Sequence, residues 1–238
     1  ITPRTIGIVL NSPSNPCGIV YPESELRAIV DVIAAHPKIA IISDEIYEKL
    51  IFPEIAHGIS HWSPGSDPRV ADLTVTINGM SKAYAMTGWR IGYMCAPGEQ
   101  SKFMREVIKL QGQMTNSIAS FFLPAVIEAL SPATLPEVEK MRIAFAERAK
   151  LIHQLLSAVP GFQTVQPTGA FYSFPNIGEL LGRKSPGGRL LDSAQAFSEA
   201  LLAEAHVAVV PGEDFGECAR NHIRLSFACS QAQIEKGV

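Results

Sequence analysis

The chain is most distinctive in the stretch Asn78-Gly-Met-Ser-Lys-Ala-Tyr-Ala-Met-Thr-Gly-Trp-Arg-Ile-Gly92, which follows an apolar, β-rich run at residues 73–77. Lys82 stands just beyond the predicted strand, and Arg90 follows it within the same turn-rich segment. A lysine delivered into a partly dry pocket can lose its proton and attack a carbonyl. An arginine offers a planar fork of donors that suits a phosphate. The stretch therefore predicts a ligand carrying both an aldehyde and a phosphate, for which pyridoxal phosphate is the obvious candidate.

Two earlier strands also end in polar residues. Residues 39–44 form a short apolar run that ends in an acid, and residues 7–11 form another that leads into a turn rich in Pro, Gly and Asn. In open α/β sheets, ligands bind beyond the carboxyl ends of the strands. The candidate site residues that follow apolar strands in this way are Asn15, Asp44, Tyr47, Lys82 and Arg90.

The first half of the chain alternates strand and helix patterns, which favours an α/β fold with a largely parallel, doubly wound sheet. We predict strands at 5–11, 38–44, 73–77 and 91–96, with helices at 22–36, 99–113 and 121–130.

A long helix is predicted at residues 135–159, because charges are spread among apolar positions until Pro160 and Gly161 end the pattern. Beyond it, short strands at 169–174, 207–210 and 222–227 surround a helix at 193–205, which predicts a smaller α+β domain. The expected organisation is therefore the C-terminal part of a large domain at 1–134, an interdomain helix at 135–160 and a small domain at 161–238, truncated at its end.

Composition excludes several classes of protein. The net charge is −3 and no basic run is present, so we expect no nucleic-acid partner. No apolar stretch approaches the roughly 18 residues of a membrane helix, and the first residues lack the layout of a signal peptide. The four cysteines are widely separated, which predicts reduced thiols in a cytoplasmic protein and no metal site. His57 and His61 have helical metal-ligand spacing, but without a further ligand they are expected to be ordinary surface histidines.

Several motifs together resemble one family. They are Asn15-Pro-Cys-Gly18, Asp44-Glu-Ile-Tyr47, the segment from Ser81 to Gly92, Gly169-Ala-Phe-Tyr172, residues 209–216 and His222-Ile-Arg-Leu-Ser-Phe227. In this order they resemble the fold-type I pyridoxal-phosphate aminotransferases of class I/II, and within them the bacterial aspartate aminotransferase branch. Members of that family are longer, with a phosphate-binding loop and a ring-stacking aromatic residue near the N-terminus. The resemblance therefore implies that this chain is a fragment, which could be inactive by itself.

The resemblance also implies roles for the cofactor-binding residues. Lys82 would form a Schiff base with the cofactor and then act as general base and acid at the substrate Cα. Asp44 would pair with the pyridine nitrogen, although a helix N-cap is an almost equally common role for an acid at a strand end. Tyr47 would donate to the phenolic oxygen of the cofactor, and Ser81 and Arg90 would bind its phosphate.

Two residues are implied for the substrate. Arg224 resembles the arginine that binds the substrate α-carboxylate, with an exposed strand position as the alternative. Asn15 resembles a residue that contacts both cofactor and substrate, with turn formation before Pro16 as the alternative.

The predicted activity is transamination between an amino acid, aspartate by resemblance, and a 2-oxo acid such as 2-oxoglutarate, by a ping-pong mechanism. The resemblance further implies a cytoplasmic homodimer. Two other functions stay open. One is a lyase or decarboxylase on the same scaffold, and the other is a non-catalytic, aminotransferase-like regulatory domain.

Overall fold

The computed structural model describes residues 1–97 and 102–238, and these form two compact units. Unit 1 comprises residues 1–13, 21–51 and 58–141, and unit 2 comprises residues 14–20, 52–57 and 142–238. The chain thus contributes two short early segments to unit 2 before its C-terminal part completes that unit.

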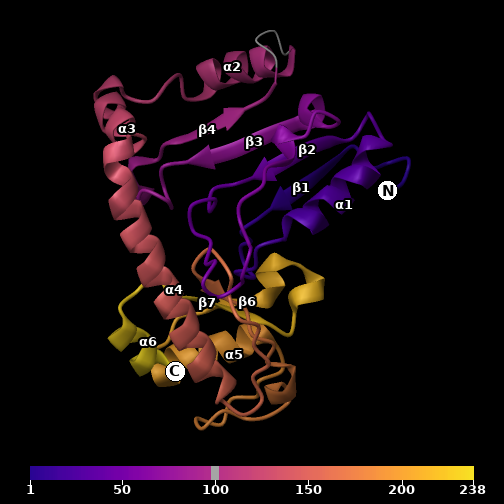
Figure 1. The fold of residues 1–238 in the computed structure, drawn as a ribbon. Helices are drawn as coiled ribbons and strands as arrows, with labels where there is room; N and C mark the ends of the chain where they lie inside the picture. The colour runs from indigo at the N-terminus through magenta and orange to yellow at the C-terminus, as the bar shows by residue number, and fades with distance from the viewer. Residues whose placement is uncertain (98–101) are drawn as a thin grey trace. The chain divides into compact units, whose positions relative to one another are not determined.

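Unit 1 is built on a four-stranded sheet in the order β1-β2-β3-β4 (Figure 1). The strands are β1 (Gly7–Asn11), β2 (Ala40–Asp44), β3 (Thr74–Gly79) and β4 (Gly92–Cys95). The pairs β1–β2 and β2–β3 are parallel, which confirms the largely parallel α/β sheet. Their register places Asp44 between Asn11 and Ile77, so that the three strands end at one edge.

The fourth strand runs antiparallel to β3, a direction the sequence pattern did not specify. A parallel neighbour needs a crossover connection, usually a helix. Here the connection contains only turns and the 3₁₀ helix Thr87–Trp89, and Met80 N–H donates to the carbonyl of Ile91 at 3.1 Å. The motif containing Lys82 and Arg90 is therefore the loop that returns the chain along β3.

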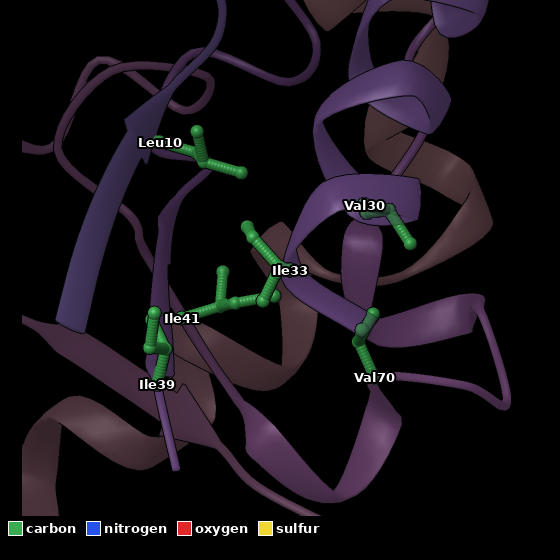
Figure 2. Packing of buried hydrophobic residues seen from close by; sticks show 6 residues of the cluster. All are labelled: Leu10, Val30, Ile33, Ile39, Ile41 and Val70. Carbon is green, nitrogen blue, oxygen red and sulfur yellow. The ribbon is translucent and has the colours of Figure 1, made fainter. Parts of the chain in front are cut away.

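One face of the sheet is covered by α1 (Glu23–Ala34), whose residues Leu26, Val30 and Ile33 are buried at helical spacing. Figure 2 shows the resulting core, in which Ile33 lies near Ile41 while Val30 and Val70 lie close together. Burying such a side chain contributes about 1.5–3 kcal/mol. This core packs against β1 and β2, and β2 ends in Asp44.

Three further helices follow the sheet in the chain: α2 (Lys102–Met114), α3 (Leu123–Ala129) and α4 (Leu135–Ser157). The first three residues of the helix predicted at 99–113 lie outside the described residues. Residues 135–141 of α4 belong to unit 1 and residues 142–157 to unit 2.

Unit 2 contains a small antiparallel sheet in the order β5-β7-β6. Its strands β5 (Tyr172–Ser173), β6 (Val210–Pro211) and β7 (Ile223–Ser226) are shorter than predicted, because turns and 3₁₀ segments occupy the neighbouring residues. The predicted helix at 193–205 is α5 (Ala194–Ala200) followed by a π-helical turn at Leu201–Ala205, and α6 (Gln231–Gly237) lies near the C-terminus. Around α5 lies a core formed by Ile177, Leu191, Ala194, Phe197, Ala200 and Ile223.

Within the described part of the chain, no single helix is both long and apolar enough to cross a membrane. Two successive segments, 120–129 and 132–157, are long and apolar enough for a membrane span only when they are counted together. They are bent by 60° at their junction.

Candidate active site

Asp44 is the last residue of β2 and lies half-buried at the strand edge of unit 1. Its Oδ1 accepts a hydrogen bond from Ile46 N–H at 3.3 Å, and its carbonyl accepts one from Asn11 Nδ2 at 3.3 Å. Burial raises the pKa of the Asp44 carboxyl, the Ile46 hydrogen bond opposes this, and the charge of Glu45 adds to the rise. A carboxylate in this state is stabilised by any cation or proton donor that binds beside it.

Lys82 lies in a closed loop that follows β3. Met86 N–H donates to Met80 O at 3.3 Å and Ala85 N–H donates to Lys82 O at 3.2 Å, and Ala85 takes a left-handed conformation with φ of 52°. The Lys82 Nζ atom lies 5.9 Å from the centroid of the Tyr47 ring, which is only 3% exposed. The structure therefore brings Lys82 and Tyr47 together at the strand edge that also carries Asp44.

Arg90 ends the 3₁₀ helix of the same loop in a left-handed conformation, with φ of 56°. Its Nη1 donates to the carbonyl of Thr87 at 3.0 Å, and the side chain is exposed. It also lines a cavity of about 410 Å³ together with Trp89 and Ser117. Ser81 is half-buried directly before Lys82, so a hydroxyl and an amine are adjacent in the loop.

In unit 2 the structure brings together Asn15 and Arg224. Arg224 lies on β7, and its Nη1 donates to Asn15 Oδ1 at 2.8 Å. Its Cζ lies 4.7 Å from the centroid of the Tyr172 ring and 5.0 Å from that of Phe215. A guanidinium flanked by aromatic rings and held by an amide has a restricted orientation, which suits recognition of a planar carboxylate.

The loop that carries Asn15 is fixed by Gly18. This glycine has φ of 68°, and a Cβ built on it would lie 2.1 Å from the carbonyl oxygen of Tyr172. Its own carbonyl accepts hydrogen bonds from Thr168 N–H at 2.8 Å and Gly169 N–H at 3.0 Å. The absence of a side chain thus lets the Asn15 loop lie against the segment that leads to Tyr172.

One polar network next to Asp44 was missed in the sequence. Glu45 is 5% exposed, and its carboxylate accepts hydrogen bonds from Ser63 at 2.5 Å, Ser43 at 2.8 Å and His61 Nε2 at 2.9 Å. Burial favours a higher pKa for Glu45, but these hydrogen bonds outweigh it, and the pKa is lowered. The expectation that His61 is an ordinary surface histidine is wrong, because it is half-buried against Glu45. The position of Glu45 directly after a buried strand was the sequence feature that could have indicated a hydrogen-bonding partner for its carboxylate.

Among the described residues, Glu45, Glu48 and His61 form a group whose donor atoms all lie within 4.8 Å of one another. His61 Nε2 is 3.9 Å from Glu48 Oε2. Ser43 and Ser63 both donate to Glu45 Oε1, and His61 Nε2 lies 2.9 Å from Glu45 Oε2, so hydrogen bonds within the protein account for the closeness of Glu45 and His61.

Comparison with known proteins places this geometry in a family. The family model described as aminotransferase class I and II matches residues 1–238. The chain belongs to the class I and II aminotransferases. It is 44% identical over 239 aligned positions to the aspartate aminotransferase of Geobacillus stearothermophilus, covering 100% of this chain and 57% of that protein. It is 40% identical to the aspartate/prephenate aminotransferase of Cereibacter sphaeroides, covering 99% of this chain and 57% of that one.

Solved structures of aminotransferases share the fold. The aspartate aminotransferase of Rhizobium meliloti matches with a TM-score of 0.86 and 35% identity, covering 100% of this chain and 57% of that one. The aromatic aminotransferase of Pyrococcus horikoshii matches with a TM-score of 0.88 and 34% identity, covering 100% and 59%. The chain thus spans a little over half the length of these aminotransferases.

Proposed function

We propose that the protein containing this chain transfers an amino group between an amino acid and a 2-oxo acid, with aspartate and 2-oxoglutarate as the first pair to test. The observation that carries the proposal is the Lys82 amine beside the buried Tyr47 ring, in a loop at the strand edge that carries Asp44. Aspartate is favoured because relatives named aspartate aminotransferases match the chain over its whole length.

The donor set fits pyridoxal phosphate. Burial raises the pKa of Asp44, so a protonated pyridine nitrogen beside it would relieve an unfavourable charge. The same edge offers a phenol at Tyr47 and an amine at Lys82, and the loop adds Ser81 and Arg90 for a phosphate. When bound, this cofactor supplies an aldehyde and an electron-withdrawing ring.

Each residue of the chain has a distinct proposed task. Lys82 Nζ would hold the aldehyde of the cofactor, and as a free amine it would act as general base and then general acid for the proton of the substrate Cα. Asp44 holds a proton on the ring nitrogen, and Tyr47 donates its O–H to the phenolic oxygen. Arg224 binds the substrate α-carboxylate with a bidentate fork, and Asn15 contributes amide hydrogen bonds to cofactor and substrate. We further propose that the protein works in the cytoplasm as a homodimer.

The test is a half-reaction on the protein at its full natural length, loaded with pyridoxal phosphate. L-Aspartate alone should change the absorbance of the bound cofactor and release oxaloacetate, and 2-oxoglutarate should restore the starting spectrum. Lys82→Ala should abolish both changes, whereas Lys109→Ala, an exposed lysine paired with Glu106, should leave them intact. Release of carbon dioxide, or a stable spectrum with every amino acid of a panel, would contradict transamination.

A further inference from the structure

Unit 2 contains a cavity of about 360 Å³ that none of the proposed active-site residues line. Its apolar walls come from the core around α5 and include Leu191, Phe197, Ala200 and Leu201. This volume falls in the range of about 300–1,000 Å³ typical of small-molecule sites. The cavity is thus large enough and apolar enough to hold the body of a small ligand.

Two cations lie among the lining residues. Arg183 and Lys184 both have exposed side chains. Within the described ranges, 1–97 and 102–238, no side-chain hydrogen bond or ion pair involves either of them. Two other arginines of this unit do form ion pairs, Arg189 with Glu199 and Arg220 with Glu217. The cavity therefore combines apolar walls with two cations that form no ion pair within the described part of the chain.

The one acidic lining residue, Glu204, is committed to the loop beside the cavity. Its Oε1 accepts a hydrogen bond from the Ser185 hydroxyl at 2.7 Å, and its Oε2 accepts one from Gly187 N–H at 2.9 Å. A Cβ on Gly187 would lie 2.7 Å from Glu204 Oε1, so the absence of a side chain at Gly187 allows this close contact. Ser185 N–H also donates to Arg189 O at 2.8 Å, which closes the loop on itself. The loop that bears Lys184 is therefore preformed.

The helix wall is shaped by the π-helical turn at Leu201–Ala205, which follows α5 directly. A π turn is wider than an α turn and is often found at functional sites. Three of its residues, Leu201, Glu204 and Ala205, line the cavity. An uninterrupted α-helix would present a different set of side chains to this space.

We propose that this cavity binds a small amphipathic carboxylate, with its aliphatic tail against Phe197 and Ala200 and its head group at Arg183 and Lys184. Apolar walls select the tail, and the two cations select an anionic head. This site is separate from the transamination proposed above, and binding can be measured without cofactor or amino acid.

The test is isothermal titration calorimetry of the protein at its full natural length with octanoate. We expect saturable binding below about 10 mM, the range that the usual yield per non-hydrogen atom allows for so small a ligand. A negative heat-capacity change should accompany it, because apolar surface is buried. Octanol and octylamine should bind more weakly, and inorganic phosphate should not compete at equal concentration.

Variants locate the binding. Ala205→Trp adds bulk at an exposed lining position and should abolish octanoate binding, with the unfolding midpoint as a check on folding. Arg183→Gln with Lys184→Gln should weaken octanoate about three- to tenfold and leave octanol unchanged, as expected for exposed charge pairs. Lys150→Gln, an exposed lysine of α4, is the matched control and should bind like the parent chain.

The outcomes are separable. Any one of three results would overturn the proposal. They are the absence of saturable octanoate binding, octanol binding as tight as that of octanoate, and octanoate binding by the variant with both Arg183→Gln and Lys184→Gln that equals that of the parent. Because the two charged positions are exposed, the double variant tests it even if Ala205→Trp does not fold.

Discussion

Arg224 Nη1 donates a hydrogen bond to Asn15 Oδ1 at 2.8 Å, although 209 residues separate them in the sequence. The bond uses only part of the guanidinium, which has five N–H donors. Tyr172 and Phe215 restrict the remainder by lying within 5.0 Å of its central carbon. The result is an arginine held in place before any substrate arrives.

Arg224→Lys should therefore weaken binding of the substrate carboxylate although the positive charge is kept. A lysine keeps the charge but loses the planar fork and its packing against two rings. We expect the KM for L-aspartate to rise about tenfold or more, since a hydrogen bond to a charged group is worth about 1.5–3 kcal/mol. Steady-state kinetics would measure this, with Arg220→Lys on the exposed surface as the control. An unchanged KM would remove Arg224 from the substrate site.

Asp44→Asn should stabilise the ligand-free protein at neutral pH. The folded-state pKa of Asp44 is raised above 3.8 by burial, so the unfolded chain loses this proton at lower pH than the folded one. Stability is therefore lost as the pH rises from 3.8 through the folded pKa, and asparagine removes that loss. Thermal unfolding from pH 3 to 8 should show a gain at pH 7 that shrinks toward acid.

Asp72→Asn, at an exposed position, is the control and should follow the parent protein at every pH. A stability gain for Asp44→Asn that did not depend on pH would show that its ionisation is not the cause.

Glu45→Gln should destabilise the protein at neutral pH, the opposite of the effect of Asp44→Asn. Hydrogen bonds from His61, Ser63 and Ser43 keep the pKa of Glu45 below its usual 4.5 despite burial. The carboxylate thus contributes stability above pH 4.5 that is lost as the pH falls through the folded pKa. Chemical denaturation at pH 7 should show a loss of about 1–3 kcal/mol, the usual cost of breaking a buried hydrogen-bonded group.

The same network can be tested from its histidine. His61→Ala leaves Glu45 without one of its donors and should lower the unfolding midpoint at pH 7, whereas His57→Ala at an exposed position should not. Equal effects of the two histidine variants would mean that the network does not stabilise unit 1.

Gly79→Ala should disrupt the loop that carries Lys82. A Cβ at this position would lie 2.8 Å from Ile91 O and 3.0 Å from Gly92 Cα, both backbone atoms of the β3–β4 connection. We expect a loss of about 1–3 kcal/mol, as for overpacked sites. Gly112→Ala is the matched control, because it lies in α2 with no atom near its added Cβ and should stabilise by about 0.5–1 kcal/mol. Denaturant titrations of both variants would decide.

Patterns local in the chain predicted much of unit 1. Apolar runs marked β1, β2 and β3, and the spacing of Leu26, Val30 and Ile33 marked α1, because each pattern reflects one buried face. The direction of β4 was not predictable in this way, since a strand has the same pattern in either direction. In unit 2, turns shortened the strands and a π turn replaced the end of the helix at 193–205, because tertiary packing outweighed local propensity there.

Contacts between residues far apart in the sequence could not be predicted from hydrophobic periodicity. Nothing in the segment around His61 indicates that it bonds the buried Glu45, and nothing beside Asn15 indicates Arg224. The motif order pointed to Asn15 and Arg224 only through resemblance to a family. Arg183 and Lys184 were likewise not indicated as site residues, because they lie outside every strand and helix predicted from the sequence.

The way unit 2 is assembled from three stretches of chain limits how the protein can be dissected. A polypeptide starting at Arg142 would contain most of that unit but not residues 14–20 and 52–57. It would lose Phe52 N–H, which donates to Thr168 O at 2.9 Å, and Gly18 O, which accepts from Thr168 and Gly169. A single protease cut within α4 would therefore not release an intact unit. To produce unit 2 alone, both early segments would have to be joined to it by circular permutation or added as separate peptides.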